Sequence, residues 1–440
     1  MIDCEPKIKV ALLQDCREAR IILNGVFHLP GGQRAAAVQH IRIIAGKIIL
    51  NDVAGHEFAV EKETFLTAGK HSTFTLNIKI GIDFHWQRIK QLTFRGNIIL
   101  ISNAGLSFHL LNEILLEDYL SAVVSSEMSA AAPLEFLKAQ AITARSWLVA
   151  MLERKNTAIA ACTDFCNDKE IIRWRDTNDH LLFDVCADDH CQRYQGITGI
   201  TTADVNKAVR ATRGIYLVYE NKICDARYYK SCGGRTEIFL TAWQEESFPY
   251  LQSITDNACS CPPVQSEDDA RKWLKDEPPA YCNTQDEKLL SRILPAFDRD
   301  TIDFYRWHVS YDREELEELL FKKSGIDFGT LQSLIPVKRG PSGRISKLQI
   351  AGTKRIILVG KELEIRRWLS PTHLLSSAFV ISPEYSPTGV ITRFLLDGGG
   401  WGHGVGLCQI GAAVMAAKGF CAADILTHYF SGARLQKLYE

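Results

Sequence analysis

The sequence lacks the features that identify a protein with a transmembrane helix, a non-specific binder of nucleic acid or anionic membranes, and a repeat protein. No stretch of the 440 residues approaches the roughly 18 uninterrupted apolar residues of a transmembrane helix. The formal net charge is only −1, so the basic excess that non-specific binding to nucleic acid or anionic membranes requires is absent. Internal repeats and low-complexity segments are also lacking. With 46% hydrophobic and 23% charged residues, the composition is that of a folded globular protein and excludes a disordered chain.

The first six residues have neither a basic segment nor an apolar segment, so they carry no secretion signal. A chain that stays in a reducing compartment keeps most of its thiols reduced. The thirteen cysteines are therefore interpreted first as metal ligands, then as buried thiols, and last as disulfides. Removal of a leader would reverse that order, because an exported chain meets an oxidising environment.

The chain is long enough for two or three domains, since one core stops growing at roughly 250–300 residues. We predict an α+β fold with a β-rich N-terminal domain (1–110), a helical core in two parts (111–256 and 346–440) and a smaller mixed α/β insertion (257–345). The β-branched runs that predict N-terminal strands are 7–13, 41–44, 47–50, 74–80 and 97–102. Later strands are predicted at 215–219, at 225–230 and within 328–368, and later helices at 202–213, 312–323, 407–418 and 422–430.

Two consecutive predicted helices, 113–128 and 133–154, carry charges on their apolar faces. Glu127 extends the apolar stripe of the first helix, and Lys138 and Arg145 fall inside or beside the apolar face of the second. A buried charge costs several kcal/mol unless it is paired or faces a polar cavity. The charges therefore either form an internal Glu–Arg ion pair or reach water through long stems. The alternative is that all three line a cleft.

A glycine-rich segment, 398–406, contains Trp401 and His403 among six glycines. It has neither the spacing of a dinucleotide-binding fingerprint nor the Gly-Lys-Ser/Thr of a P-loop. Glycines at this density let the backbone approach a ligand closely, and a Trp and a His in such a loop suit a polar ring such as a sugar. The alternative is a tight structural turn with a histidine satisfied inside the core.

Four metal-binding side chains, His180, Cys186, His190 and Cys191, fall within twelve residues. This spacing can supply three or four tetrahedral zinc ligands, although short Cys/His groupings also arise by accident. The other cysteines are interpreted as buried thiols or disulfides (Cys162 with Cys166, and Cys259, Cys261 and Cys282) or as small packing residues (Cys232 and Cys408).

Four blocks of the sequence resemble the stage II sporulation protein D / amidase-enhancer family, whose members act on peptidoglycan. The blocks, in the family's order, are 116–128, 133–147, a composite of 190–196, 213–214 and 231–237, and 400–412. Together they span roughly 110–440, and the β-rich region that ends in Phe94-Arg-Gly also looks like the family's N-terminal part. Cys232, Cys408 and the stretch 257–310 depart from the family pattern.

The resemblance implies a lytic transglycosylase that cleaves the MurNAc–GlcNAc bond, with strands free of stem peptides as the preferred substrate in sporulation members. Glu127 matches the catalytic acid, and Lys138 and Arg145 match important basic positions. The substrate-binding residues that we expect from this resemblance are Lys138, Gln140, Arg145, Tyr229, Ser231, Gly233, Gly234, Trp401, His403 and Gln409. His180, Cys186 and Cys191 are the expected zinc ligands, with His190 as the alternative, and the zinc is expected to be structural.

The sequence is consistent with this chemistry, because it shows no evident second carboxylate in a setting like that of Glu127, on an apolar helix face. An ordinary glycosidase needs two, whereas a lytic transglycosylase uses the substrate's own 6-hydroxyl as nucleophile and forms a 1,6-anhydro product. The rival function is a non-catalytic peptidoglycan-binding protein that enhances a cell-wall amidase, and a third is a purely structural zinc protein. Glycan strands or muropeptides are the expected partners, with an amidase as a further one.

The sequence supports two different cellular locations for the protein. Peptidoglycan lies outside the cytoplasmic membrane, which predicts a protein of the cell envelope if a leader was removed. The N-terminus without a signal predicts a cytoplasmic protein that acts on recycled muropeptides.

Overall fold

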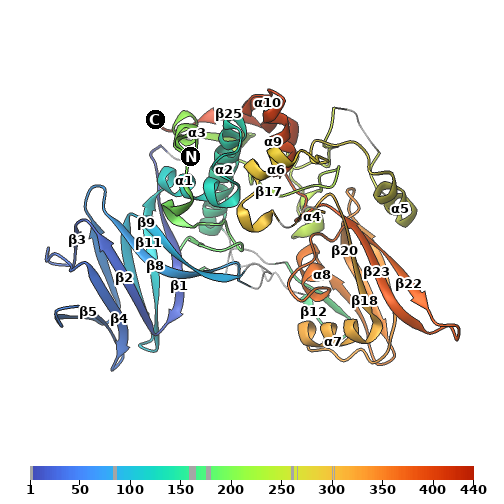
Figure 1. The fold of residues 1–440 in the computed structure, drawn as a ribbon, viewed down its shortest axis with the longest axis horizontal. Coiled ribbons are helices and arrows are strands. Elements are labelled where there is room, and N and C mark those ends of the chain that lie inside the picture. Colours follow the sequence, from blue (N-terminus) through green and yellow to red (C-terminus); the bar gives the residue numbers. More distant parts are fainter. Residues whose placement is uncertain are drawn as a thin grey trace. The chain divides into compact units, whose positions relative to one another are not determined.

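The computed structural model describes residues 3–82, 87–157, 165–174, 180–258, 262–264, 266–299, 301 and 303–440 (Figure 1). The predictions for Cys162, Cys259 and Cys261 lie outside these residues. Helices and several β-sheets are combined in the chain, so the predicted α+β class is confirmed. The residues form two compact units: the first contains 1–145, 177–216 and 437–440, and the second contains 146–176 and 217–436.

The first unit is rich in strands, as predicted for the N-terminal region, and Figure 1 shows these strands in blue. One six-stranded sheet has the order β14 (Val185–Cys186), β1 (Lys7–Cys16), β11 (Ser107–Leu115), β10 (Asn97–Asn103), β7 (Glu63–Ala68) and β3 (Phe27–His28). A second has the order β6 (Glu57–Val60), β5 (Lys47–Asp52), β4 (Val38–Ile44), β2 (Glu18–Asn24), β8 (Thr73–Ile80) and β9 (Arg88–Arg95). Along β8 every second residue is buried, which is the pattern of a strand with one face on a core.

The helices of the first unit follow β11. They are α1 (Leu116–Glu127), the N-terminal part of α2 (Leu134–Thr157), the 3-10 turn η2 (Gly196–Gly199) and α3 (Ala203–Ala211). The predicted helix start at residue 113 is wrong, because β11 continues to Leu115. The strand keeps its extended backbone there because Glu113 and Leu115 pair with Lys9 and Lys7 of β1.

The predicted one-sided apolar face of the second helix is also wrong. In α2 every residue from 139 to 151 is buried, including Gln140 and Arg145, which are both fully inaccessible. In α1 only Asp118 is exposed. Because neighbouring segments cover α2 on every side over these residues, a polar side chain there is buried whatever its angular position on the helix.

Sheets also organise the second unit. A five-stranded sheet has the order β12 (Phe165–Cys166), β13 (Glu170–Ile172), β21 (Ile356–Gly360), β20 (Ile345–Gly352) and β19 (Leu331–Arg339). A three-stranded sheet has the order β18 (Arg306–Asp312), β23 (Ile391–Gly399) and β22 (Phe379–Tyr385). Two small sheets contain β16 (Lys222–Ile223), β15 (Ile215–Tyr219) and β25 (Arg434–Lys437), and β17 (Tyr228–Tyr229) with β24 (Leu407–Cys408).

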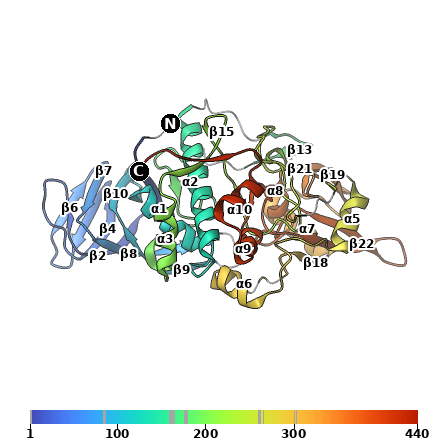
Figure 2. The same ribbon diagram turned by 90° about the horizontal axis from the view of Figure 1, so that it is seen from above.

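The helices of the second unit are shown from above in Figure 2, where α9 and α10 lie side by side. They are α4 (Phe239–Ala242), α5 (Glu267–Asp276), α6 (Glu287–Ile293), the 3-10 turn η3 (Ala296–Asp298), α7 (Arg313–Ser324), α8 (Glu362–Trp368), α9 (Gln409–Ala417) and α10 (Ala422–Tyr429). The β-rich prediction up to residue 368 is wrong over α8. This helix buries Ile365 and Trp368 in the same core as Phe379 and Phe394, so tertiary packing supports it.

None of the helices in the described part of the chain is both long enough and apolar enough to cross a membrane.

Candidate functional site

Glu127 is the last residue of α1, and its side chain is 8% exposed. Its Oε1 accepts a hydrogen bond of 3.0 Å from the backbone N–H of Arg193. Two residues further along the chain, the N–H of Gln195 donates to Ser126 Oγ at 3.2 Å. The segment 192–195 is therefore bonded to the C-terminal end of α1, and its backbone orients the Glu127 carboxylate.

Side chains fix this segment in place. Tyr119 Oη donates to Gln192 Oε1 at 3.1 Å, and Gln192 Nε2 donates to the carbonyl of Ala144 at 3.3 Å. Tyr194 Oη donates to Asn112 Oδ1 at 2.6 Å, and its ring stacks on that of Tyr119 with centroids 5.0 Å apart. Burial raises the pKa of Tyr119 well above its usual value, so this hydroxyl stays a hydrogen-bond donor. Buried bonds of this kind give a site little freedom to rearrange.

The predicted Cys/His cluster comes together just before that segment. The ligand atoms of His180, Cys186, His190 and Cys191 all lie within 4.8 Å of one another. Cys191 Sγ is 3.3 Å from His180 Nε2 and 3.6 Å from His190 Nδ1. The Cys191 thiol and the two imidazoles together lower the pKa of Cys186 below its ordinary value, in opposition to burial. Two thiols and two imidazoles at this separation form a donor set that suits tetrahedral zinc.

Cys186 enters this cluster from a strand, because β14 pairs in parallel with β1 and sets Cys186 opposite Ala11. Asp188 then turns the chain, and its carboxylate accepts the backbone N–H groups of Gly81 and Ile82, both at 3.1 Å. Burial, assisted by the charge of Asp189, raises the pKa of Asp188 to about 6. Cys191 precedes the Glu127 partner Arg193 by two residues, so the cluster and the carboxylate share one short stretch of backbone.

Arg145 is paired with a residue that the sequence did not single out. Its guanidinium donates from Nε and Nη2 to the two carboxylate oxygens of Glu117, at 3.0 and 2.6 Å, and from Nη1 to the carbonyl of Ile215 at 3.0 Å. Glu117 also accepts from Gly214 N–H at 3.3 Å and from Tyr439 Oη at 2.5 Å. Arg145 is therefore in an internal Glu–Arg ion pair, but its acid is Glu117 and not the predicted Glu127.

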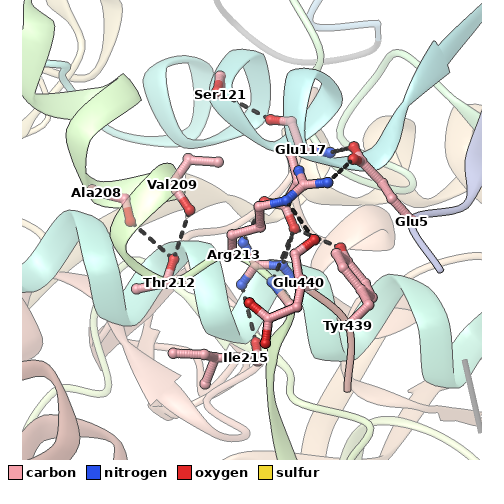
Figure 3. A network of polar contacts seen from close by, with 12 residues as sticks. Glu5, Glu117, Ser121, Ala208, Val209, Thr212, Arg213, Ile215, Tyr439 and Glu440 are labelled. Carbon is pink, nitrogen blue, oxygen red and sulfur yellow. Dashed lines mark hydrogen bonds and ion pairs between the residues drawn. The ribbon is translucent and has the colours of Figure 1, made fainter. Parts of the chain in front are cut away.

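A wider network surrounds Glu117, as Figure 3 shows. The backbone N–H of Glu117 donates to Glu5 Oε1 at 2.9 Å, and Arg213 Nη2 donates to Glu5 Oε2 at 2.6 Å. The Arg213 guanidinium also lies 5.5 Å from the ring centroid of Tyr439. Glu117 stands in the first turn of α1, where a carboxylate is favoured by the helix dipole, and this position is the signal by which sequence reasoning could have found it.

Lys138 and Gln140 have different surroundings. Lys138 is partly exposed and donates to Glu135 at 2.6 Å, one turn earlier on α2. Gln140 is fully buried. The substrate-binding roles expected for Lys138, Gln140 and Arg145 remain predictions.

The glycine-rich segment belongs to the second unit and lies against the segment that contains Ser231. β24 pairs in parallel with β17, which sets Tyr229 opposite Cys408. Ser231 and Trp401 exchange both backbone hydrogen bonds, at 3.1 and 2.7 Å. Tyr229, Ser231 and Gln409 are buried, whereas Trp401 is partly exposed.

Glycine is required at two positions of this contact. Gly233 has φ +75°, and a Cβ there would lie 2.8 Å from the backbone nitrogen of Gly400. Gly404 has φ +84°, and a Cβ there would lie 2.5 Å from the guanidinium carbon of Arg344. Gly234, with φ +117°, is also in the left-handed region. The glycines therefore allow two stretches of backbone and a buried arginine to approach one another.

His403 has hydrogen bonds at both ring nitrogens. Nδ1 lies 3.1 Å from the N–H of Val405 and must accept, and Nε2 lies 3.0 Å from the carbonyl of Tyr228 and must donate. The ring is therefore the neutral Nε2–H tautomer. Burial, followed by the charges of Arg227 and Arg344, lowers the pKa of His403 well below its usual value. These contacts are those of a histidine satisfied inside the core, and its predicted sugar contact remains a prediction.

The predicted site residues are divided between the units. Glu127, Lys138, Gln140, Arg145 and the Cys/His cluster lie in the first, whereas the residues from Tyr229 to Gly234 and from Trp401 to Gln409 lie in the second.

Comparison with known proteins finds two family models that match two separate stretches of this chain. Residues 105–219 match the family model described as "Stage II sporulation protein", and residues 237–406 match one described as "Domain of unknown function (DUF8618)". The first match covers α1, α2 and the Cys/His cluster.

Curated relatives extend the similarity beyond these domains. The chain is 24% identical over 331 residues to stage II sporulation protein D of Bacillus amyloliquefaciens, covering 75% of this chain and 77% of the relative. It is 26% identical over 326 residues to the protein of the same name from Bacillus subtilis, covering 74% and 75%. It is also 24% identical to the amidase enhancer of Bacillus subtilis over 72% of this chain and 40% of that protein. The resemblance predicted from the four sequence blocks is confirmed.

Proposed function

We propose that this protein, which carries a stage II sporulation protein domain, is a peptidoglycan lytic transglycosylase with Glu127 as its only acid–base group. Its similarity to stage II sporulation protein D and to an amidase enhancer supports a role related to the cell wall. The observation that carries the finer proposal is the setting of Glu127. A buried carboxyl group ends α1 inside the matched domain, with an Arg193 backbone N–H on one oxygen.

The contacts of Glu117 support a mechanism with one carboxyl group. Both oxygens of Glu117 are engaged by Arg145, and Oε1 also accepts from Gly214 and Tyr439. A carboxylate whose two oxygens are both held in buried hydrogen bonds is not positioned to attack a substrate. Since a conventional glycosidase requires a second free carboxylate, the occupied state of Glu117 favours chemistry in which the substrate supplies the nucleophile.

The proposed reaction has two proton transfers and consumes no water. Glu127, as the acid, gives its proton to the glycosidic oxygen while the bond from that oxygen to C1 of MurNAc breaks, and the GlcNAc side leaves as an alcohol. The 6-hydroxyl oxygen of the same MurNAc forms a new bond to C1, and its proton returns to the Glu127 carboxylate. The nucleophile is intramolecular, so a high effective molarity replaces a second enzyme group. The Arg193 N–H stabilises the carboxylate between the two transfers.

The test is digestion of glycan strands freed of stem peptides, with mass spectrometry to detect 1,6-anhydroMurNAc ends. The wild type should form these ends, and Glu127→Gln should reduce their rate of formation at least about 100-fold, the usual contribution of an acid–base group. Glu63→Gln, which changes an exposed carboxylate of the same unit, is the matched control and should retain activity. Parallel digestion of strands with intact stem peptides measures the proposed preference for bare strands.

Equal product from wild type and Glu127→Gln, or no product from the wild type, would overturn the proposal. The amidase-enhancer relative favours one specific alternative, in which the protein binds strands and stimulates a cell-wall amidase without cleaving. That function predicts strand binding and amidase stimulation that survive Glu127→Gln. Measurement of both in the same preparations separates the two functions.

A structural zinc ion belongs to this proposal. His180, Cys186 and Cys191, with His190 as the further donor, would hold it, because their ligand atoms all lie within 4.8 Å of one another and are of the types that zinc binds. The ion would supply folding energy and no step of the reaction. Protein purified without added metal should contain zinc at this site, and Cys186→Ser should remove one equivalent. A wild type without zinc and with full stability would refute this part.

A further inference from the structure

A second group of potential metal ligands lies in the second unit, and neither the function proposed above nor the sequence motifs account for it. It consists of Cys232, Asp256, Cys282 and Cys408, whose ligand atoms all lie within 4.8 Å of one another. All four side chains are 0% exposed. They come from separate parts of the chain: Cys232 follows β17, Cys282 lies between α5 and α6, and Cys408 ends β24. We refer to these residues as the Cys3Asp cluster.

Backbone N–H groups point at two of the sulfur atoms. The N–H of Cys232 donates to Cys408 Sγ at 3.3 Å, and the N–H of Gly234 donates to Cys232 Sγ at 3.3 Å. The second bond needs the left-handed backbone of Gly233 and Gly234, with φ of +75° and +117°. N–H donors to sulfur favour a thiolate, the form in which cysteine binds a metal.

The carboxylate is oriented in the same way. Asp256 Oδ2 accepts the backbone N–H of Cys282 at 2.8 Å, and Oδ1 accepts Tyr429 Oη at 2.5 Å. Each oxygen retains a second lone pair. Ligating carboxylates are commonly supported by such outer hydrogen bonds, which fix their direction toward the ion.

Burial of Asp256 among three thiols calls for a compensating positive charge. Within the described residues, no lysine or arginine forms an ion pair with Asp256. The two nearby guanidiniums have other partners. Arg306 donates to backbone carbonyls that include that of Gly233, and the buried Arg344 donates to those of Gly402 and Cys232. An ionised carboxylate with no cation in a dry site is costly. Protonation of Asp256 or a bound cation removes that cost, and only the cation also accounts for the three converging thiols.

A disulfide accounts for this arrangement less well. Cys232 Sγ and Cys282 Sγ are 3.4 Å apart, far beyond the roughly 2.05 Å of an S–S bond. One disulfide would also leave the third thiol and the carboxylate unexplained. In a tetrahedral site with Zn–S bonds of about 2.3 Å, neighbouring sulfur atoms lie ~3.8 Å apart, close to the observed separation.

We propose that the Cys3Asp cluster binds a divalent zinc ion in a tetrahedral site of three thiolates and one carboxylate. Zinc is the metal class that thiolate-rich tetrahedral sites select. All four positions are occupied by protein and buried, so the ion is structural. It ties Cys232 and Cys408, which flank the matched domain of unknown function (237–406), to Asp256 and Cys282 inside that domain. Cys282 belongs to the stretch that departs from the family pattern. This inference does not depend on the proposed function.

Metal content of the full chain tests the proposal. Protein purified without added metal should contain two zinc ions, one in the Cys3Asp cluster and one in the His180–Cys191 cluster. Cys186→Ser should keep one, and the X-ray absorption spectrum of that ion should fit three sulfur ligands and one oxygen. This measurement leaves the Cys3Asp cluster intact, so it does not rely on a variant that fails to fold.

Substitution within the cluster gives the complementary result. Cys282→Ser should lose one zinc equivalent, whereas Cys224→Ser, which changes another fully buried cysteine of the same unit outside the cluster, should lose none. Cobalt(II) in place of zinc should give thiolate charge-transfer absorption that Cys282→Ser weakens. No zinc in Cys186→Ser, a spectrum without sulfur, or a Cys232–Cys282 disulfide in the unreduced wild type would overturn the proposal. Failure of the transglycosylase assay would leave these outcomes unchanged.

Discussion

Replacement of Arg145 by methionine tests whether this residue acts through stability or through substrate contact. The guanidinium is 0% exposed and makes two hydrogen bonds to Glu117 and one to Ile215. Breaking a buried ion pair by removing one partner costs about 3–5 kcal/mol. Glu117 would keep its hydrogen bonds from Gly214 and Tyr439, so we expect Arg145→Met to cost about 3 kcal/mol, the lower end of that range.

The assay combines calorimetric unfolding with hydrogen exchange of the α1 amides, because the chain has two units and one melting temperature describes neither alone. Lys138→Met is the control: its partly exposed pair with Glu135 should contribute at most about 1 kcal/mol. The double variant Arg145→Met with Glu117→Leu should recover much of the loss, since a buried pair replaced by apolar groups is often neutral. An Arg145→Met protein of unchanged stability that fails to bind glycan strands would refute the structural role.

Three further predictions concern the glycine-rich segment and the zinc site. Because the pKa of His403 lies well below 6.5 in the fold, the unfolded chain binds a proton that the folded chain does not. The free energy of unfolding should thus fall by up to about 1.4 kcal/mol for each pH unit below pH 6.5. His403→Gln should reduce this pH dependence. The same pH dependence in wild type and variant would contradict the prediction. Gly404→Ala should lower the free energy of unfolding in urea more than Gly389→Ala. Gly389 has a similar φ (+80°), but a Cβ added there would have no atom within 4 Å. Equal losses of stability in the two variants would exclude the steric clash at Gly404. Cys186→Ser should speed hydrogen exchange of the Arg193 amide and slow transglycosylation. An unchanged exchange rate would show that the zinc cluster does not hold the backbone that bonds to Glu127.

Sequence patterns predicted the local features well. Short runs of β-branched residues located strands such as β8 and β10, and the apolar stripe of α1 identified buried residues including Leu120 and Val123. The spacing from His180 to Cys191 predicted a cluster that the structure brings together. These predictions succeed because periodicity and short spacing depend on residues within a few positions of one another, and local backbone geometry then places their side chains.

Other features depend on contacts that no local pattern contains. Residues 139–151 of α2 are buried on every side of the helix, so the expected one-sided face was wrong. The partner of Arg145 is Glu117, 28 residues earlier, and Tyr439 reaches the same carboxylate from 322 residues away. Interpreted singly, Cys232 and Cys408 looked like packing residues.

The sequence by itself determined the α+β class, the family resemblance and Glu127 as the candidate acid. Only the tertiary structure decided which charge neutralises Arg145, that His403 is a neutral ring bonded at both nitrogens, and that three distant cysteines converge on Asp256. The physical reason is that the cost of a buried charge or thiol depends on the groups that surround it. Those groups are brought together by packing of segments far apart in the chain, and residue type and spacing do not encode that packing.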